Sequence, residues 1–283
     1  MSDLLAGLAS MGLGGLKDMA VFEEKTKKPQ AEDGKAQAPQ ITEKDMIYDK
    51  GYECPLCDHK IIAKTVKAGK CKLSHTDLDL RPVYEGIDVV KYDVVVCPHC
   101  GHAAVTRFLQ PLSSMQMKLI RENISKSFNM KVQEGETLSY EDAFQRYQLA
   151  LVNSIVKKAR TSERAYVCLK SGWLLRGWQE SITGTSEEDQ KKKEELAAKE
   201  KEYLQNALDG FMTAVQNESF PMCGMDEITT NYLMAVLAMK FERFDVASKL
   251  VASILTSPSA SARMKDKTRD LKEMILEEIK KKK

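Results

Sequence analysis

The sequence lacks an apolar run that could cross a lipid bilayer. The best candidate, Leu4–Leu16, has 13 uncharged residues, four of them glycine, whereas a membrane-spanning helix needs about 20 residues. The residues before Leu4 include Asp3 and no lysine or arginine, so a secretory signal is not expected either. These absences predict a cytoplasmic protein without a membrane span.

A large excess of charge of either sign is also missing. The 283 residues include 43 Lys or Arg and 41 Asp or Glu, which gives a net charge of +2. Proteins that derive their affinity from neutralising many phosphates are usually far more basic. Hydrophobic residues make up 43% and charged residues 30%, a composition typical of soluble globular domains. The length predicts about two such domains.

The familiar motifs of enzyme active sites are absent as well. The sequence contains no P-loop, dinucleotide-binding fingerprint, nucleophile elbow or His-Glu-x-x-His. Zinc deaminases need His-x-Glu before their paired cysteines, but His59 is followed by Lys60 and Ile61, and His75 by Thr76 and Asp77. We therefore expect no catalytic residues, and a protein that is not an enzyme.

Cysteine is present and unevenly distributed. Five of the seven cysteines lie between residues 54 and 100, and the four histidines, at positions 59, 75, 99 and 102, lie in nearly the same window. An odd number of cysteines without a secretory signal argues against a disulfide framework. The clustering of the two residue types indicates a metal site.

Two cysteine pairs in this window have the spacing of zinc knuckles, Cys54-Pro-Leu-Cys57 and Cys97-Pro-His-Cys100. Zinc favours four ligands in a tetrahedron, about 2.3 Å from each sulfur. The spacing therefore predicts a structural Zn²⁺ held by Cys54, Cys57, Cys97 and Cys100. Gly101 is expected to adopt a left-handed conformation after the second turn.

Other interpretations of these cysteines remain open. Cys97 and Cys100 also have the form of a redox dithiol, and the two pairs could be unrelated cysteines of a small β-domain. Cys71 and His75 could bind a second metal ion, with His59 or His102 as a further ligand, or replace a ligand of the first. The simpler interpretation is a packed thiol and a surface imidazole.

The residues between the cysteine pairs predict strands, at Lys60–Lys67, Leu78–Tyr84 and Ile87–Val96, because they are rich in β-branched residues and bounded by turn residues. Beyond residue 111, the periodicity of apolar residues favours helices. The helices are expected at about 139–158, 162–181, 186–218, 225–240, 244–256 and 260–281.

A short pattern recurs along these helices, in which small residues flank a bulky one. Its three occurrences are Ala143-x3-Tyr147-x2-Ala150, Ala207-x3-Phe211-x2-Ala214 and, loosely, Ala247-x3-Val251-x2-Ile254. Such spacing lets helices pack closely, as in stacked helical hairpins, although its intervals differ from the roughly 34 residues of tetratricopeptide repeats. A generic helical bundle is the alternative. We expect the core of these helices to be separate from that of the zinc module.

These patterns predict an α+β fold that is mainly α: a small β-rich, zinc-ribbon-like module followed by a tetratricopeptide-like α-helical repeat domain. The expected organisation is an N-terminal segment and flexible linker at 1–46, the zinc module at 47–110 and the helical domain at 111–283.

Three motifs in this order resemble an uncharacterised bacterial family, domain of unknown function (DUF) 2225, over roughly residues 44 to 256. They are Cys54-Pro55-x-Cys57, Asp79-Leu80-Arg81-Pro82-x-Tyr84 and Tyr92-x-x-x-Val96-Cys97-Pro98-x-Cys100-Gly101. The resemblance implies a paired-cysteine zinc module joined to tetratricopeptide-like helices, with the four paired cysteines as presumed ligands. It implies no activity, substrate or catalytic residue.

The first functional hypothesis is a non-catalytic, zinc-binding adaptor whose helical repeats bind a protein or peptide in a groove. The alternatives are a nucleic-acid-binding zinc ribbon and a CxxC thiol redox protein. Nucleic-acid binding is disfavoured, because residues 51–110 hold 8 basic and 7 acidic side chains and nucleic-acid modules are usually markedly basic.

Overall fold

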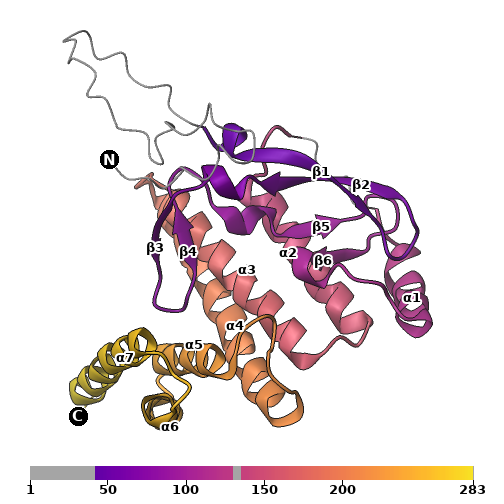
Figure 1. Ribbon diagram of the computed structural model, residues 1–283. Coiled ribbons are helices and arrows are strands. Elements are labelled where there is room, and N and C mark those ends of the chain that lie inside the picture. The colour runs from indigo at the N-terminus through magenta and orange to yellow at the C-terminus, as the bar shows by residue number, and fades with distance from the viewer. Residues whose placement is uncertain (1–41, 130–134, 283) are drawn as a thin grey trace, which may run out of the picture. The chain divides into compact units, whose positions relative to one another are not determined.

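Strands occupy the first part of the described chain and helices the rest. The computed structural model describes residues 42–129 and 135–282 (Figure 1). These described residues form one compact unit. The architecture is α+β and mainly α, as predicted, with a small strand-rich part before the helices. Most of the predicted N-terminal segment and linker, up to residue 41, lies outside the described residues, and the predicted domain boundaries stay predictions.

The strands form three antiparallel hairpins of two strands each. The pairs are β1 (Ile47–Glu53) with β2 (Lys60–Val66), β3 (Leu73–Thr76) with β4 (Pro82–Tyr84), and β5 (Val94–Val96) with β6 (Ala103–Val105). Their registers pair Ile47 with Val66 and Val95 with Ala104. The loops of the first and third hairpins are the two cysteine turns, so each cysteine pair sits at the tip of its own hairpin.

Two of the predicted strands are shorter than expected because turns interrupt them. Of Leu78–Tyr84, only the last three residues are strand: Leu80 has φ of 71° and its N–H bonds the carbonyl of Asp77. Of Ile87–Val96, only Val94–Val96 is strand, because the Asp88 side chain accepts a hydrogen bond from Val90 N and caps a 3₁₀ turn. In both places a side chain or a backbone turn competes with the sheet.

The helices lie where the sequence predicts them. They are α1 (Ser114–Ile120), which continues into a π-helical turn at Arg121–Ser125, α2 (Tyr140–Val156), α3 (Thr161–Ser181), α4 (Glu187–Asn217), α5 (Glu227–Lys240), α6 (Phe244–Thr256) and α7 (Ala262–Lys281). Ser139, Ser186 and Asp226 start α2, α4 and α5 by accepting a backbone N–H of the first turn. Within the described part of the chain, none of these helices could serve as a membrane span.

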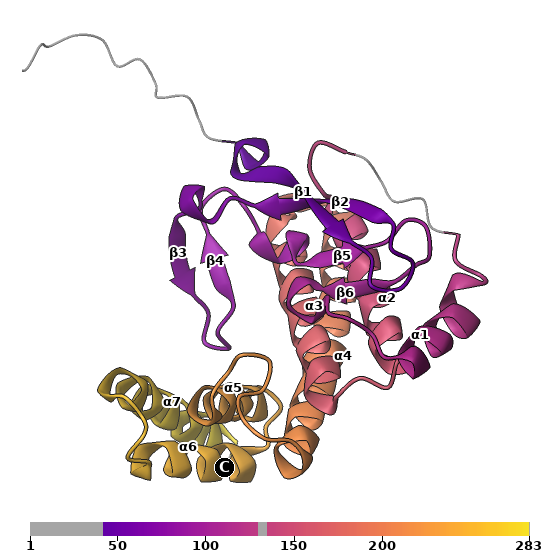
Figure 2. The same ribbon diagram turned by 45° about the vertical axis from the view of Figure 1, so that its right-hand side comes forward.

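The recurring small-bulky-small positions all face the core. Their side chains are between 0 and 2% exposed, at Ala143, Tyr147, Ala150, Ala207, Phe211, Ala214, Ala247, Val251 and Ile254. Figures 1 and 2 both show α5, α6 and α7 grouped together at the C-terminal end of the helical part, where α5 packs on α6 and α6 on α7.

Glycines allow α3 and α4 to approach closely. A Cβ added at Gly172 would lie 2.6 Å from Leu204 Cδ2, and one at Gly210 would lie 2.8 Å from Ala165 Cβ. Both distances are shorter than van der Waals contact, so a larger residue would push the two helices apart. The α3–α4 pair is the extended contact on which the helical part is built.

The core of the helices is shared with the strands, and the expectation of two separate cores is wrong. Buried residues of the last β-hairpin and of the 3₁₀ turn before it belong to the same hydrophobic cluster as the helices: Val90, Val94, Val96, Ala103 and Val105. The Tyr147 hydroxyl of α2 also donates to the carbonyl of Val90, at 3.0 Å. The separation fails because β5 and β6 present their apolar face to α2 (Figure 1).

A buried ionic network joins the β3–β4 hairpin to the helices. Arg176 of α3 contacts Asp79 at 2.6 Å and Glu200 of α4 at 3.0 Å, and Glu200 also pairs with Lys240 of α5 at 2.7 Å. Arg81, only 4% exposed, pairs with Glu180 of α3 at 2.6 Å. Buried ions are stable only when paired, so this network fixes the hairpin against three helices.

The close packing of α3 on α4 predicts a position-specific effect of side-chain size. Gly210→Val should lower the free energy of unfolding by about 1–3 kcal/mol, because the new side chain overpacks a filled contact. Gly51→Val is the matched control, since a Cβ at Gly51 meets no atom within 4 Å. Urea unfolding measures both variants, and equal stabilities would contradict the packing described.

Candidate metal centre

The four paired cysteines converge at one point. Their sulfur atoms all lie within 4.8 Å of one another. Two of these distances cross between the two turns: 3.6 Å from Cys54 Sγ to Cys100 Sγ and 3.6 Å from Cys57 Sγ to Cys97 Sγ. Four sulfurs at about 2.3 Å from one ion in a tetrahedron lie roughly 3.8 Å apart. The arrangement therefore fits a single metal ion between the two hairpins.

Each cysteine turn has the same backbone geometry, set by its residues. In the first turn, the N–H of Cys54 donates to the carbonyl of His59, and the N–H of Asp58 donates to the carbonyl of Cys54. The N–H groups of Cys97 and Gly101 make the equivalent hydrogen bonds in the second turn. The residue after the second cysteine is left-handed in both turns, with φ of 60° at Asp58 and 73° at Gly101. Glycine and aspartate tolerate this conformation, and the expectation for Gly101 is confirmed.

The segment formed by α1 and its π-helical turn covers the two cysteine turns. Arg121 donates to the carbonyl of Leu56 at 2.9 Å, and Ser125 Oγ to that of Cys100 at 2.8 Å. Ile120 and Ile124 are buried in one cluster with Cys54, Cys97 and Cys100. Three of the four sulfur ligands are consequently enclosed, while Cys57 is partly exposed.

The chemistry of the thiols favours a bound cation. The hydrogen bond with Cys100 lowers the pKa of Cys54 to about 4 and raises the pKa of Cys100 well above its usual range. Burial raises the pKa of Cys57 to about 11. Without a cation, Cys57 and Cys100 therefore keep their protons at neutral pH, and a thiophilic metal ion is what would allow all four to bind as thiolates.

Asn153 of α2 connects the second cysteine turn to the helices, a role that was not predicted from the sequence. Its side chain donates to the carbonyl of Gly101 at 3.0 Å and lies 3.2 Å from His102 Nδ1. Asn153 is 0% exposed and His102 is 1% exposed. Burial lowers the pKa of His102, so its ring is neutral at pH 7. An isolated Asn in an amphipathic helix carries no motif by which it could have been found.

The other candidate ligands take different places. His59 and His99 are exposed and stacked, with ring centroids 3.6 Å apart, and each offers a nitrogen within 4.8 Å of Cys57 Sγ. Cys71 Sγ lies 3.5 Å from the carbonyl of Lys67, and His75 is exposed on β3, 3.3 Å from Asp77. Among the described residues, neither Cys71 nor His75 belongs to a group of three or more potential ligands. Their role in a second metal site stays a prediction.

The Asn153 contacts predict a stability effect that its sequence position does not suggest. Asn153→Ala should lower the free energy of unfolding by about 1–3 kcal/mol, because the buried carbonyl of Gly101 loses its partner. Asn206→Ala is the matched control, since exposed Asn206 bonds only the carbonyl of Glu202 in its own helix. Denaturant unfolding of both variants should show a loss for Asn153→Ala alone.

Comparison with known proteins gives one match. The family described as "Uncharacterized protein conserved in bacteria (DUF2225)" matches residues 47–275. Searches of the curated proteins and of the solved structures return no match. The matched region includes both cysteine turns, the β3–β4 hairpin and most of the helical part. The chain therefore belongs to the DUF2225 family.

Proposed function

We propose that this protein is a non-catalytic adaptor of the cytoplasm, in which a structural zinc ion fixes the β-rich part and tetratricopeptide-like helical hairpins bind another protein. The observation that carries the proposal is the combination of a closed four-sulfur site with an open groove on the helices. The four-sulfur site would make the β-rich part rigid, and the groove would provide the surface that binds the other protein.

Zinc is the metal that suits this site best. A tetrahedral site of four cysteines is typical of structural zinc or of iron–sulfur centres. The spacing of the two cysteines within each CxxC turn is that of zinc ribbons. Four protein ligands leave no open position for a substrate or a water molecule, so the ion would have a structural role. A reducing compartment such as the cytoplasm keeps such thiols available.

The sulfur distances also bear on the redox alternative. In a dithiol active site, the two cysteines of one CxxC turn are reaction partners. Here each cysteine also has a sulfur of the other turn 3.6 Å away. This geometry favours a shared ion over an isolated dithiol.

The proposed binding surface is a groove of about 660 Å³ between α2, α3 and α4. Phe144, Leu151 and Tyr203 contribute its apolar surface. Ile155, which is 53% exposed, extends this surface towards solvent, and Val152 on the same helix is 46% exposed. Apolar side chains exposed next to a groove indicate an interaction site.

The charges of the groove favour an amphipathic helix from another protein as the occupant. Basic Arg164 and Lys199 and acidic Glu202 and Asp209 all line it. A groove lined by apolar side chains and by charges of both signs suits a helix with one apolar stripe and flanking charges of both signs. It suits a uniformly anionic ligand less well.

The zinc proposal predicts the effect of removing one ligand. Purified protein should contain about one zinc per chain, and Cys54→Ser should lose it together with its β-structure, because structural zinc contributes on the order of 10–16 kcal/mol in small modules. Cys71→Ser is the control and should keep both. Elemental analysis and circular dichroism give the readouts, and a folded Cys54→Ser protein without metal would refute a structural role.

The adaptor proposal predicts that one exposed side chain controls partner binding. A photo-crosslinking amino acid at Thr213, which lines the groove, should capture a defined protein in the cells of origin. Ile155→Asp should abolish the capture, because a charge replaces exposed apolar surface, while the fold is retained. Met274→Asp, on α7 and 40% exposed, should not affect it. Equal capture by both variants would exclude the groove as the binding site.

A further inference from the structure

Arg146 of α2 is a buried cation whose Nε atom has no hydrogen-bond partner among the described residues. The residue is 6% exposed, and its Nε atom is buried and makes no hydrogen bond. No hydrogen bond or ion pair joins its guanidinium to any other residue in the described ranges 42–129 and 135–282. A buried charge is costly unless it is paired, so its position requires an explanation.

Comparison with another buried arginine makes the contrast clear. Arg81 is exposed to a similar degree, 4%, and its guanidinium contacts Asp77 at 2.8 Å and Glu180 at 2.6 Å. The chain therefore provides carboxylates where an arginine serves to hold elements together. Among the described residues, Arg146 has no pair of carboxylates like that of Arg81. This favours a ligand from outside the protein as its partner.

Arg146 faces a cavity of about 500 Å³ between β2, β5 and the start of α2. This volume lies within the usual range for small-molecule sites. Val94 and Val96 of β5 form part of its wall, and Pro98 of the second cysteine turn lies at one end. The cavity is therefore bordered by the rigid part of the module, next to the metal centre.

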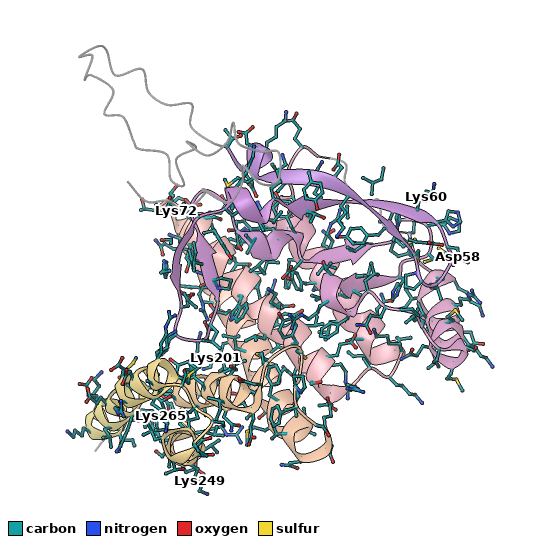
Figure 3. The ribbon with its side chains drawn as sticks, in the orientation of Figure 1. Asp58, Lys60, Lys72, Lys201, Lys249 and Lys265 are labelled. Atoms are coloured by element: carbon teal, nitrogen blue, oxygen red, sulfur yellow. The ribbon has the colours of Figure 1, made fainter. Side chains whose placement is uncertain are left out.

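The described residues that line the cavity carry a net positive charge. Lys60 and Lys64 of β2 line it together with Arg146, and Asp49 is the acidic residue among the described lining residues. Asp49 is paired with Lys64 at 3.0 Å. Figure 3 shows Lys60 and Asp58 at the outer end of the β1–β2 hairpin, and Lys60 lines the cavity.

Asp142 of the same helix interacts electrostatically with Arg146. Asp142, one turn earlier, raises the pKa of the guanidinium, but burial lowers it by more. The Asp142 Oδ2 atom accepts a hydrogen bond from Ser139 Oγ at 2.5 Å, at the start of the helix. Arginine remains charged under these conditions, so the cavity holds a guanidinium whose N–H groups are available to a ligand.

We propose that this cavity binds the phosphate group of a small phosphorylated metabolite, with Arg146 as the principal ligand and Lys60 and Lys64 as supporting cations. The planar guanidinium donates two parallel hydrogen bonds to phosphate oxygens. The cavity has room for more than a phosphate ion, and the apolar side chains of β5 would contact the uncharged part of the metabolite. This site is independent of the groove between α2, α3 and α4.

Binding of inorganic phosphate to the zinc-loaded full chain tests the proposal. Titration calorimetry and thermal unfolding at constant ionic strength should show saturable binding to the wild type. Arg146→Met should weaken it at least tenfold, the loss expected for a charge-assisted hydrogen bond. The same variant should unfold at a higher temperature than the wild type in phosphate-free buffer, because an unpaired buried charge has been removed.

Two further variants separate the site from general surface charge. Arg146→Lys keeps the charge but not the two parallel donors, and should bind phosphate more weakly than the wild type and more tightly than Arg146→Met. Lys50→Met removes a charge from β1 outside the cavity and should bind like the wild type. Equal binding by the wild type and Arg146→Met, or no binding by the wild type, would overturn the proposal. Binding of citrate without binding of phosphate would overturn the phosphate assignment.

Discussion

The convergence of four sulfur atoms is the constraint on which the β-rich part depends. In the part of the chain that the structure describes, the three hairpins are separate two-stranded sheets, with no ladder of backbone hydrogen bonds between them. Isolated hairpins are at best marginally stable in water. The sulfurs of Cys54 and Cys57 lie next to those of Cys100 and Cys97, which belong to a different hairpin. One metal ion bound to all four would therefore connect the two hairpins. The α1 segment then packs over a cluster that already has a fixed shape.

Two other connections continue this rigid part into the helices. The apolar face of the β5–β6 hairpin packs on α2 within the main hydrophobic cluster, and Asn153 ties the second cysteine turn to the same helix. The buried ions around Arg176 hold the β3–β4 hairpin against α3, α4 and α5. A disturbance at the metal centre would therefore reach α2 directly, and the module is part of the helical fold instead of an appendage to it.

The sequence predicted the features that local patterns encode. Cysteine spacing identified the four sulfurs that converge, and apolar periodicity placed the helices from α2 to α7. β1, β3 and β6 were not predicted. In β3, Leu73–Thr76 is exposed throughout, so it shows no alternation of buried and exposed residues. In β6, Ala103–Val105 is three residues long, too short for a pattern to be recognised. Asn153 and Arg146 were also not recognised. Each is one polar residue in an amphipathic helix, and its importance comes from groups that are distant in the sequence.

The metal centre is asymmetric, and the asymmetry has a chemical consequence. Cys54, Cys97 and Cys100 are buried, whereas Cys57 is partly exposed beside the imidazoles of His59 and His99. A peroxide or other electrophile from solvent would meet Cys57 first. The sulfur of Cys97 lies 3.6 Å from it, and a disulfide between these two cysteines would link the two hairpins to each other. Oxidative loss of the ion would then leave them covalently joined, in an arrangement that reduction could return to the metal-binding form.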